Sequence, residues 1–263
     1  LRVVDAIQLT DLVPVATPAD WKPGEQCASP SHNASQMRRS EWLSSAWPLG
    51  LASGLMVVNS YVDVLVVGLF RSDSEVGTYR AAAQLAVLTA FGLQAINQVL
   101  YPHISRLYVT CDLARLQRLV TATARITTAG ALFLLAILIV AGKPILAGLF
   151  GYGFDAGSTA LTILALGQTA NAAFGSVGAL LTMTGHERDA MKGLGVALAV
   201  NVVLSVALTP HFGLVGAAMA TTISVVCWNL LLHELVWRRI GIESAAIPIR
   251  RGAFRNIASH RLS

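Results

Sequence analysis

Two ionisable residues stand inside long apolar stretches of this chain. Asp63 lies in the stretch 46–70, and Arg80 lies in the stretch 76–101. A charge inside a membrane segment costs about 2.5 kcal/mol or more, so such a residue usually faces a bundle interior or a water-filled cavity. A carboxylate in such a place can take up a proton or a cation, and a guanidinium can attract an anionic group. The two residues therefore predict a polar pathway across the membrane.

The same two residues can also meet each other. Asp63 lies roughly 10 Å from the outer end of its predicted helix and Arg80 roughly 5 Å from the outer end of the next, at about 1.5 Å per residue. Only a short turn separates the two helices, so antiparallel neighbours would bring the charges within reach of a salt bridge. Two interpretations stay open: a buried ion pair that locks the hairpin, or a switchable pair in which Arg80 contacts an anionic substrate and Asp63 couples an ion.

Further polar residues repeat at helical spacing around the pair. At about 100° per residue, one arc of roughly 80° holds four long side chains that we call the polar stripe: Arg80, Gln84, Gln94 and Gln98. Asn59 shares a helix face with Asp63, and Gln168 and Asn171 share another face. We expect the polar stripe, Asn59, Gln168 and Asn171 to line a substrate cavity, with Asp63 as the ion-coupling candidate.

The elements that carry these residues read as membrane helices. Hydrophobic residues make up 54% of the chain and charged residues 13%, and the mean hydropathy is +0.61; a soluble domain has roughly 25% charged residues. A spanning helix needs about 20 mainly apolar residues. Six stretches qualify or nearly qualify: 46–70, 76–101, 119–141, 158–184, 191–209 and 214–237. The runs are continuous, so we predict an all-α integral membrane protein with a six-transmembrane-helix bundle.

Basic residues set the predicted orientation. With residues 1–44 as a partly disordered cytoplasmic linker, all but four of the 19 Lys and Arg residues fall on the inner side. The six-helix lobe then covers 45–240, and 241–263 forms a basic cytoplasmic tail, so both ends of this chain are predicted to be cytoplasmic. The tail favours contact with membrane lipids over a nucleic-acid partner. Three scattered cysteines predict neither a metal site nor another cofactor.

Local signals predict where the helices end. Pro102 and Pro210 are expected to close the second and fifth spans. Between spans we expect an amphipathic surface helix over 105–118 and a glycine-dense outer loop over 143–157. Arg125 lies near the inner end of the third span, where its long side chain can reach the headgroups.

Short motifs in order along the chain carry a family resemblance. They are Pro48-Leu49, Asp63-Val64-Leu65, Gly68, Glu75-Val76-Gly77-Thr78-Tyr79, Ala81-Ala82-Ala83-Gln84-Leu85-Ala86, Pro102-His103-Ile104-Ser105, Leu164-Ala165-Leu166-Gly167-Gln168, Met183-Thr184-Gly185-His186-Glu187 and Gly213-Leu214-Val215-Gly216. Together they resemble the second half of oligosaccharide flippases of the polysaccharide-biosynthesis (Wzx-like) type, within the multidrug/oligosaccharidyl-lipid/polysaccharide (MOP) exporter superfamily. The resemblance covers about 41–242.

The resemblance implies one lobe of a two-lobed, MATE-like transporter with alternating access and no enzymatic activity. Such a flippase moves an undecaprenyl-pyrophosphate-linked oligosaccharide across the inner (cytoplasmic) membrane for surface polysaccharides such as the O-antigen of lipopolysaccharide. Its cationic cavity residues, among which Arg80 would stand, attract the pyrophosphate. The family has about twice six spans, so we expect a partner: a missing N-terminal lobe or a second copy. The start at Leu1, which is not Met, favours a C-terminal fragment.

Four other functions stay open at this point. A drug/cation antiporter lobe of the MATE type would carry more carboxylates in its spans, whereas Asp63 is the only acidic residue well inside one; a flippase for peptidoglycan precursors is a sibling possibility. An integral-membrane polysaccharide polymerase or transferase would need a larger catalytic loop than the outer loops with Asp73, Glu75 and Asp155. An accessory subunit would have its polar stripe buried against other helices.

Overall fold

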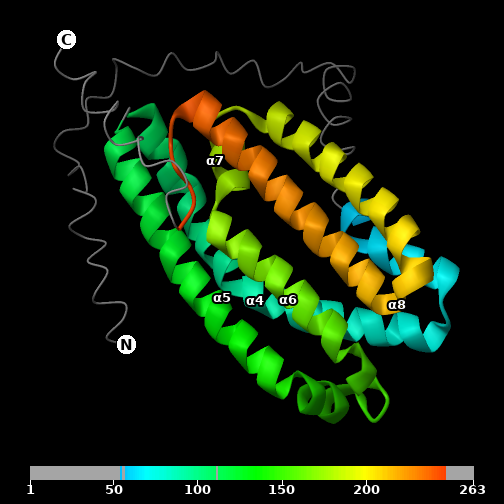
Figure 1. The fold of residues 1–263 in the computed structure, drawn as a ribbon. Helices are drawn as coiled ribbons and strands as arrows, with labels where there is room; N and C mark the ends of the chain where they lie inside the picture. The colour runs from blue at the N-terminus through cyan, green and yellow to red at the C-terminus, as the bar shows by residue number, and fades with distance from the viewer. Residues whose placement is uncertain (1–53, 55–56, 111, 247–263) are drawn as a thin grey trace, which may run out of the picture. The chain divides into compact units, whose positions relative to one another are not determined.

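The computed structural model describes residues 54, 57–110 and 112–246, all within one compact unit that covers 52–263. A helix over Val57–Phe70 comes first. The elements that follow are α4 (Asp73–Val109), α5 (Leu113–Phe150), the short 3-10 helix η2 (Phe154–Gly157), α6 (Ser158–Phe174), α7 (Val177–Met183) and α8 (Glu187–Ile240) (Figure 1). The described residues contain helices and no strand, which confirms the predicted all-α class.

Helix α8 consists of two helices that meet at Gly213. This glycine has φ 58° and ψ −136°, a backbone conformation that side chains other than glycine rarely adopt. Figure 1 shows the yellow first half and the orange second half of α8 running side by side in opposite directions. At the turn, Nη2 of Arg71 donates hydrogen bonds to the carbonyl oxygens of Thr209 and Pro210, each at 3.1 Å. The predicted fifth and sixth spans therefore lie on either side of Gly213.

The number of spans follows from length and composition. Among the described residues, three helices are long and apolar enough to cross a membrane: α4, α5 and Asp189–Ile240 of α8. The pair Phe154–Phe174 and Val177–Met183, bent by 47°, makes a fourth if it counts as one span. These helices confirm a multi-pass membrane protein. The figure of six spans stays a prediction, because the stretch 46–70 is described as a helix only over Val57–Phe70.

Pro102 and Pro210 do not end their helices as predicted, and Pro144 lies within a helix as well. Helix α4 runs through Pro102 to Val109, α5 runs through Pro144 to Phe150, and α8 stays helical past Pro210. The expected surface helix over 105–118 and the loop over 143–150 are therefore wrong. A proline removes one backbone donor but has a φ that suits a helix. Helices α4 and α5 continue because residues beyond their prolines are buried: Ile104 and Leu146 are both 0% exposed.

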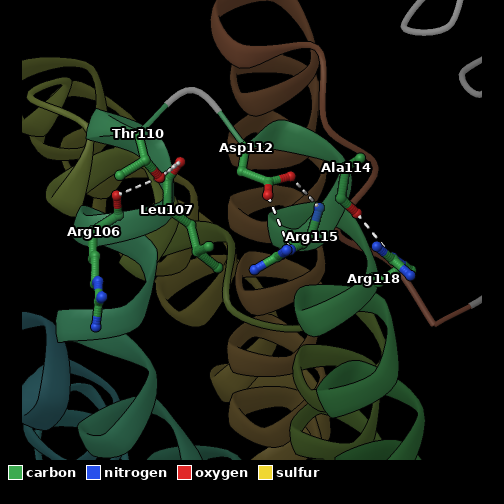
Figure 2. Close-up of polar contacts among 7 residues, drawn as sticks. All are labelled: Arg106, Leu107, Thr110, Asp112, Ala114, Arg115 and Arg118. Carbon is green, nitrogen blue, oxygen red and sulfur yellow. Dashed lines mark hydrogen bonds and ion pairs between the residues drawn. The ribbon is translucent and has the colours of Figure 1, made fainter. Parts of the chain in front are cut away.

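A short turn joins α4 to α5 (Figure 2). The hydroxyl of Thr110 donates to the carbonyl oxygens of Arg106 and Leu107, at 3.0 and 3.2 Å, where α4 ends. Asp112 accepts a hydrogen bond from the backbone N–H of Arg115 at 3.1 Å and so caps the first turn of α5. The Asp112 carboxylate also pairs with the Arg115 guanidinium at 3.0 Å.

The fourth predicted span breaks between α6 and α7. Gly175, at φ 70°, ends α6, and a Cβ on this residue would lie 2.7 Å from the carbonyl oxygen of Ser244. The last carbonyls of α6 find partners outside the helix. Thr128 donates to Ala172 at 3.3 Å, and the backbone N–H of Ala246 donates to Ala173 at 2.9 Å. The break is therefore built into the packing.

Residues 241–246, which we call the strap, pack into this break. Ile242, Glu243 and Ser244 are at most 2% exposed. Gln117 of α5 holds the Glu243 backbone from both sides: its Oε1 accepts from the N–H at 2.8 Å and its Nε2 donates to the carbonyl. His233 of α8 contacts Glu243 at 3.3 Å and Ser244 at 3.0 Å.

The strap falls where the sequence predicted the start of the basic tail, and the remaining tail residues, 247–263, lie outside the described part. Arg125 also contacts the strap: its Nε donates to the carbonyl oxygen of Ala246 at 3.2 Å. The Arg125 side chain therefore supports the strap through its Nε, and its contact with headgroups stays a prediction. The predicted linker, 1–44, likewise lies outside the described residues.

Two apolar cores hold the helices together. One contains Tyr79, Leu135, Leu161 and Ala217, from α4, α5, α6 and the second half of α8. The other contains Ile104, Leu116, Leu180 and Leu232, with α7 in the place of α6. Along α4 the first core ends at Ala86 and the second begins at Leu100. The candidate site adjoins the first core.

Candidate functional site

A cavity of about 390 Å³ lies between the Val57–Phe70 helix, α4, α6 and the two halves of α8. Its lining is rich in groups that form hydrogen bonds. The polar side chains are the amides of Asn59, Gln168, Asn171 and Asn201, the hydroxyls of Ser60, Thr221 and Ser224, and the carboxyl group of Asp63. Trp228 contributes an aromatic wall. The structure thus brings four of the predicted site residues, Asn59, Asp63, Gln168 and Asn171, to one cavity.

Asp63 is anchored by hydroxyl groups. It is 7% exposed, and its Oδ2 accepts hydrogen bonds from Tyr79 at 2.8 Å and from Thr221 at 3.3 Å. Its Oδ1 accepts from the backbone N–H of Val64 at 2.9 Å. No cation pairs with this carboxylate among the residues that the structure describes. Asp63 therefore links the first described helix to α4 and to the second half of α8 without a compensating charge.

The predicted ion pair between Asp63 and Arg80 does not form. Arg80 is exposed and makes no ion pair within the described part of the chain. Adjacent positions on a helix point about 100° apart. Because Tyr79 is 0% exposed and reaches Asp63, the next residue must point away from it. The buried-pair interpretation is therefore wrong, and the aromatic neighbour takes the place of the cation.

The polar stripe lies on the surface of α4. All four of its members, Arg80, Gln84, Gln94 and Gln98, are exposed, and none lines the cavity. The cavity wall on α4 is formed by Ala83, Ala86 and Val87. Val87 is also 44% exposed, and helical rotation places it within the arc of the stripe. The structure thus divides the predicted site into an internal cavity and an exposed stripe that adjoins it.

Sequence reasoning missed several residues of the site. Tyr79 and Thr221 are 16 and 158 positions from Asp63 along the chain. Local sequence patterns therefore could not predict their hydrogen bonds to Asp63. In α8, however, Thr221, Ser224 and Trp228 follow the helical spacing i, i+3, i+7, and all three line the cavity. This periodicity could have predicted from the sequence that the three residues share one helix face. Asn201, which is 3% exposed, belongs to no comparable helical pattern of polar cavity residues.

Polar contacts also fix α6 against the second half of α8 beside the cavity. Asn229 donates to the side-chain oxygen of Asn171 at 3.0 Å. Thr222 donates to the carbonyl oxygen of Ile163 at 2.9 Å, opposite Gly167. In the described residues no group of three or more His, Cys, Asp or Glu side chains is placed to hold a metal ion. The arrangement can bind a polar ligand or exchange a proton or cation at Asp63.

Known proteins similar to this chain are named as probable flippases. Residues 21–108 match the family described as polysaccharide biosynthesis protein. The chain is 27% identical over 176 residues to the "Probable low-salt glycan biosynthesis flippase Agl15" of Haloferax volcanii, a match that covers 66% of this chain and 37% of that protein. It is also 27% identical over 187 residues to the "Probable flippase AglR" of the same organism, with 65% and 37% covered. No solved structure matches.

These matches confirm the predicted resemblance to Wzx-like polysaccharide flippases. The relatives are named as flippases, which are transporters and not enzymes, in agreement with the prediction of a non-enzymatic protein. The chain spans less than two fifths of the length of these relatives, 37% in each case.

Proposed function

We propose that this chain, a relative of the Wzx-like polysaccharide flippases, is one lobe of a transporter that moves a lipid-linked oligosaccharide across the cytoplasmic membrane. The substrate would carry an undecaprenyl-pyrophosphate anchor and supply a cell-surface polysaccharide. The observation that carries the proposal is the exposed polar stripe, headed by Arg80, on a helix apolar enough to span a membrane. An exposed arginine facing lipid would be costly, so the stripe must face water, substrate or protein.

Arg80 is suited to hold the pyrophosphate. A guanidinium donates two parallel hydrogen bonds to a phosphate group and keeps its charge at any physiological pH. The glutamines of the stripe offer donors and acceptors to sugar hydroxyls further along α4. The opposite wall of the pathway would come from a second lobe or a second copy of this chain. Both ends of this chain would lie in the cytoplasm, as the distribution of basic residues predicts.

Asp63 is the candidate for ion coupling in this proposal. A buried carboxylate without a cation nearby is stabilised when it takes up a proton or binds a cation. Its hydroxyl partners belong to α4 and to the second half of α8, so a change at Asp63 acts on the contact between three helices. Ion uptake can thereby favour one arrangement of these helices over another, as alternating access requires.

The experiment that tests the proposal replaces Arg80 in the protein expressed from its complete gene. We expect Arg80→Ala to lower polysaccharide export by on the order of tenfold or more, the effect of losing a charged hydrogen bond worth about 1.5–3 kcal/mol. Membrane abundance should be unchanged, because Arg80 is exposed and pairs with no described residue. Arg80→Lys should retain part of the activity.

Arg106→Ala is the matched control, because Arg106 is also exposed and lies near the end of the same helix. It should leave both export and abundance at the wild-type level. The proposal fails if Arg80→Ala exports normally, or if the variant is lost from the membrane while Arg106→Ala is not.

A further inference from the structure

The cavity contains polar groups that have no partner in the described part of the chain. Ser224 is 4% exposed, and its Oγ forms no hydrogen bond there although it lines the cavity. No hydrogen bond within the described residues engages the side chains of Asn59 and Gln168, and Asn171 uses its oxygen for Asn229 while its Nδ2 is left over. A buried hydroxyl without a partner is unfavourable, and each such group in a native protein requires an explanation. These groups together point to a ligand.

The lining selects the chemical class of that ligand. Three amides and a hydroxyl, from Asn59, Gln168, Asn171 and Ser224, provide both donors and acceptors, which suits a molecule with several hydroxyl groups. Among the described residues no Lys, Arg or His lines the cavity, so an anion would find no positive charge there and would meet the Asp63 carboxyl group. The Asp63 oxygens already accept three hydrogen bonds, which lessens their attraction for an organic cation. The ligand is therefore neutral.

Trp228 provides an aromatic ring, which favours a sugar over water as the ligand. Its indole ring lines the same cavity, close to Gly193 of the first half of α8. The face of an aromatic ring carries partial negative charge and attracts the partly positive C–H groups on the flat side of a pyranose ring. A cavity of about 390 Å³ lies within the usual size range of small-molecule sites. An aromatic ring surrounded by amide groups that still have unused donors or acceptors fits a sugar ring.

The cavity also lies beside the polar stripe. Ala83 and Val87 of α4 line the cavity, and Val87 falls within the arc of the stripe. Val87 is seven positions from Arg80, which corresponds to about 10 Å along the helix axis. A sugar close to a pyrophosphate held at Arg80 can cover a distance of that order.

We propose that this cavity is a subsite for one neutral pyranose ring of the transported glycan. The ring would stack on Trp228 and exchange hydrogen bonds with Ser224, Asn59, Gln168 and Asn171. The inference rests on the proposed function for the identity of the whole substrate, and it adds the place within this chain where one of its sugars binds.

The test measures how sugars protect a thiol in the cavity of the protein expressed from its complete gene. Val225 lines the cavity without a polar role for its side chain, so Val225→Cys in a background free of Cys27, Cys111 and Cys227 serves as the reporter. Its reaction with iodoacetamide is followed in the presence of free hexoses, deoxyhexoses and N-acetylhexosamines. We expect at least one of these sugars to slow the reaction by on the order of threefold or more, the effect of a ligand at about twice its Kd.

Two further variants make the measurement specific. Ser74→Cys places a thiol at an exposed position at the start of α4, and sugars should not slow its reaction. Adding Ser224→Ala to the reporter should leave the rate without sugar unchanged and weaken the protection, because the ring loses one hydrogen-bond partner.

Three outcomes would overturn the proposal. The first is a reactive Val225→Cys thiol that no sugar protects, which would mean a cavity filled by water alone. The second is protection by tetramethylammonium in place of sugars, which would mean a cation site. The third is an inert thiol, which would mean a closed cavity.

The same reporter separates this proposal from the function on which it rests. If export does not depend on Arg80 while sugars still protect Val225→Cys, the pyrophosphate role fails and the sugar subsite stands. If export depends on Arg80 but no sugar protects the thiol, the subsite alone fails.

Discussion

At the scale of residues, two neighbours on α4 have opposite environments. Tyr79 is 0% exposed and donates a hydrogen bond to Asp63, whereas Arg80 is exposed on the polar stripe. The rotation of about 100° between adjacent residues of a helix is enough to place one in the core and the other on the surface. As a result the carboxylate is held by neutral hydroxyls, and Arg80 stays available for a ligand.

The role of Asp63 can be tested with a substitution that keeps its shape. Asp63→Asn retains an oxygen that can accept from Tyr79 and Thr221, so membrane abundance and the temperature of unfolding in detergent should stay close to wild type. The variant cannot take up a proton or bind a cation in the same way. We therefore expect polysaccharide export to fall by on the order of tenfold or more. This corresponds to a rise of about 1.4 kcal/mol or more in the activation free energy of the rate-limiting step.

Asp73→Asn provides the control, since Asp73 is exposed in the first turn of α4. It should export normally. Normal export by Asp63→Asn would show that the carboxylate only positions Tyr79 and Thr221, and the coupling role would have to be abandoned.

At the scale of elements, glycines decide where helices break and how closely they pack. Gly175 and Gly213 have positive φ values at the end of α6 and at the turn within α8. Gly167 has a different role, because it lies in the middle of α6 against α8. A Cβ at this position would lie 2.9 Å from Oγ1 and 3.2 Å from Cα of Thr222. Small residues of this kind let membrane helices approach closely.

Gly167→Ala should therefore destabilise the lobe. The added methyl group meets the backbone of α8 and displaces the Thr222 hydroxyl from the carbonyl oxygen of Ile163. We expect a loss of about 1–3 kcal/mol, the usual cost of overpacking, measured as a lower unfolding temperature in detergent.

Gly130→Ala is the comparison, because among the described residues no atom outside the adjoining backbone of α5 lies within 4 Å of a Cβ built on Gly130. It should be neutral or slightly stabilising, since alanine favours a helix by about 1 kcal/mol over glycine. Equal effects of the two substitutions would contradict a role for close packing between α6 and α8.

At the scale of the whole described unit, the strap ties together segments that are distant in sequence. Gln117 of α5, His233 of α8 and Ala173 of α6 all contact residues 243–246. The strap supplies a hydrogen bond to a carbonyl that the break in α6 leaves free. The end of the bundle that contains α7 is thus stabilised by hydrogen bonds to the backbone of the strap as well as by its apolar core.

Loss of the Gln117 side chain should loosen the strap. Gln117→Ala removes two hydrogen bonds to the buried N–H and C=O of Glu243, at a cost of about 1–3 kcal/mol for each. We expect faster amide hydrogen exchange over residues 242–246, read by mass spectrometry. Gln98→Ala, on the exposed stripe, should leave this exchange unchanged. Unaltered exchange in Gln117→Ala would mean that the strap is held by its apolar side chains alone.

The sequence by itself determined that the chain is helical and embedded in a membrane, because the free energy of transfer into lipid is a sum over consecutive residues. It also placed Asn59 and Asp63 on one helix face and Gln168 and Asn171 on another, since helical spacing is a local property. The motif order predicted the resemblance to polysaccharide flippases, which the matches confirm.

Only the tertiary structure decided which polar groups meet. The rotation of α4 about its axis, fixed by packing against α5 and α6, selects Tyr79 over Arg80 as the partner of Asp63. Burial of Ile104 beyond Pro102 keeps α4 helical, and the strap fills the break in α6. These outcomes depend on contacts between residues up to 158 positions apart. Local pattern carries no information on such contacts, because their free energy exists only once the helices are packed.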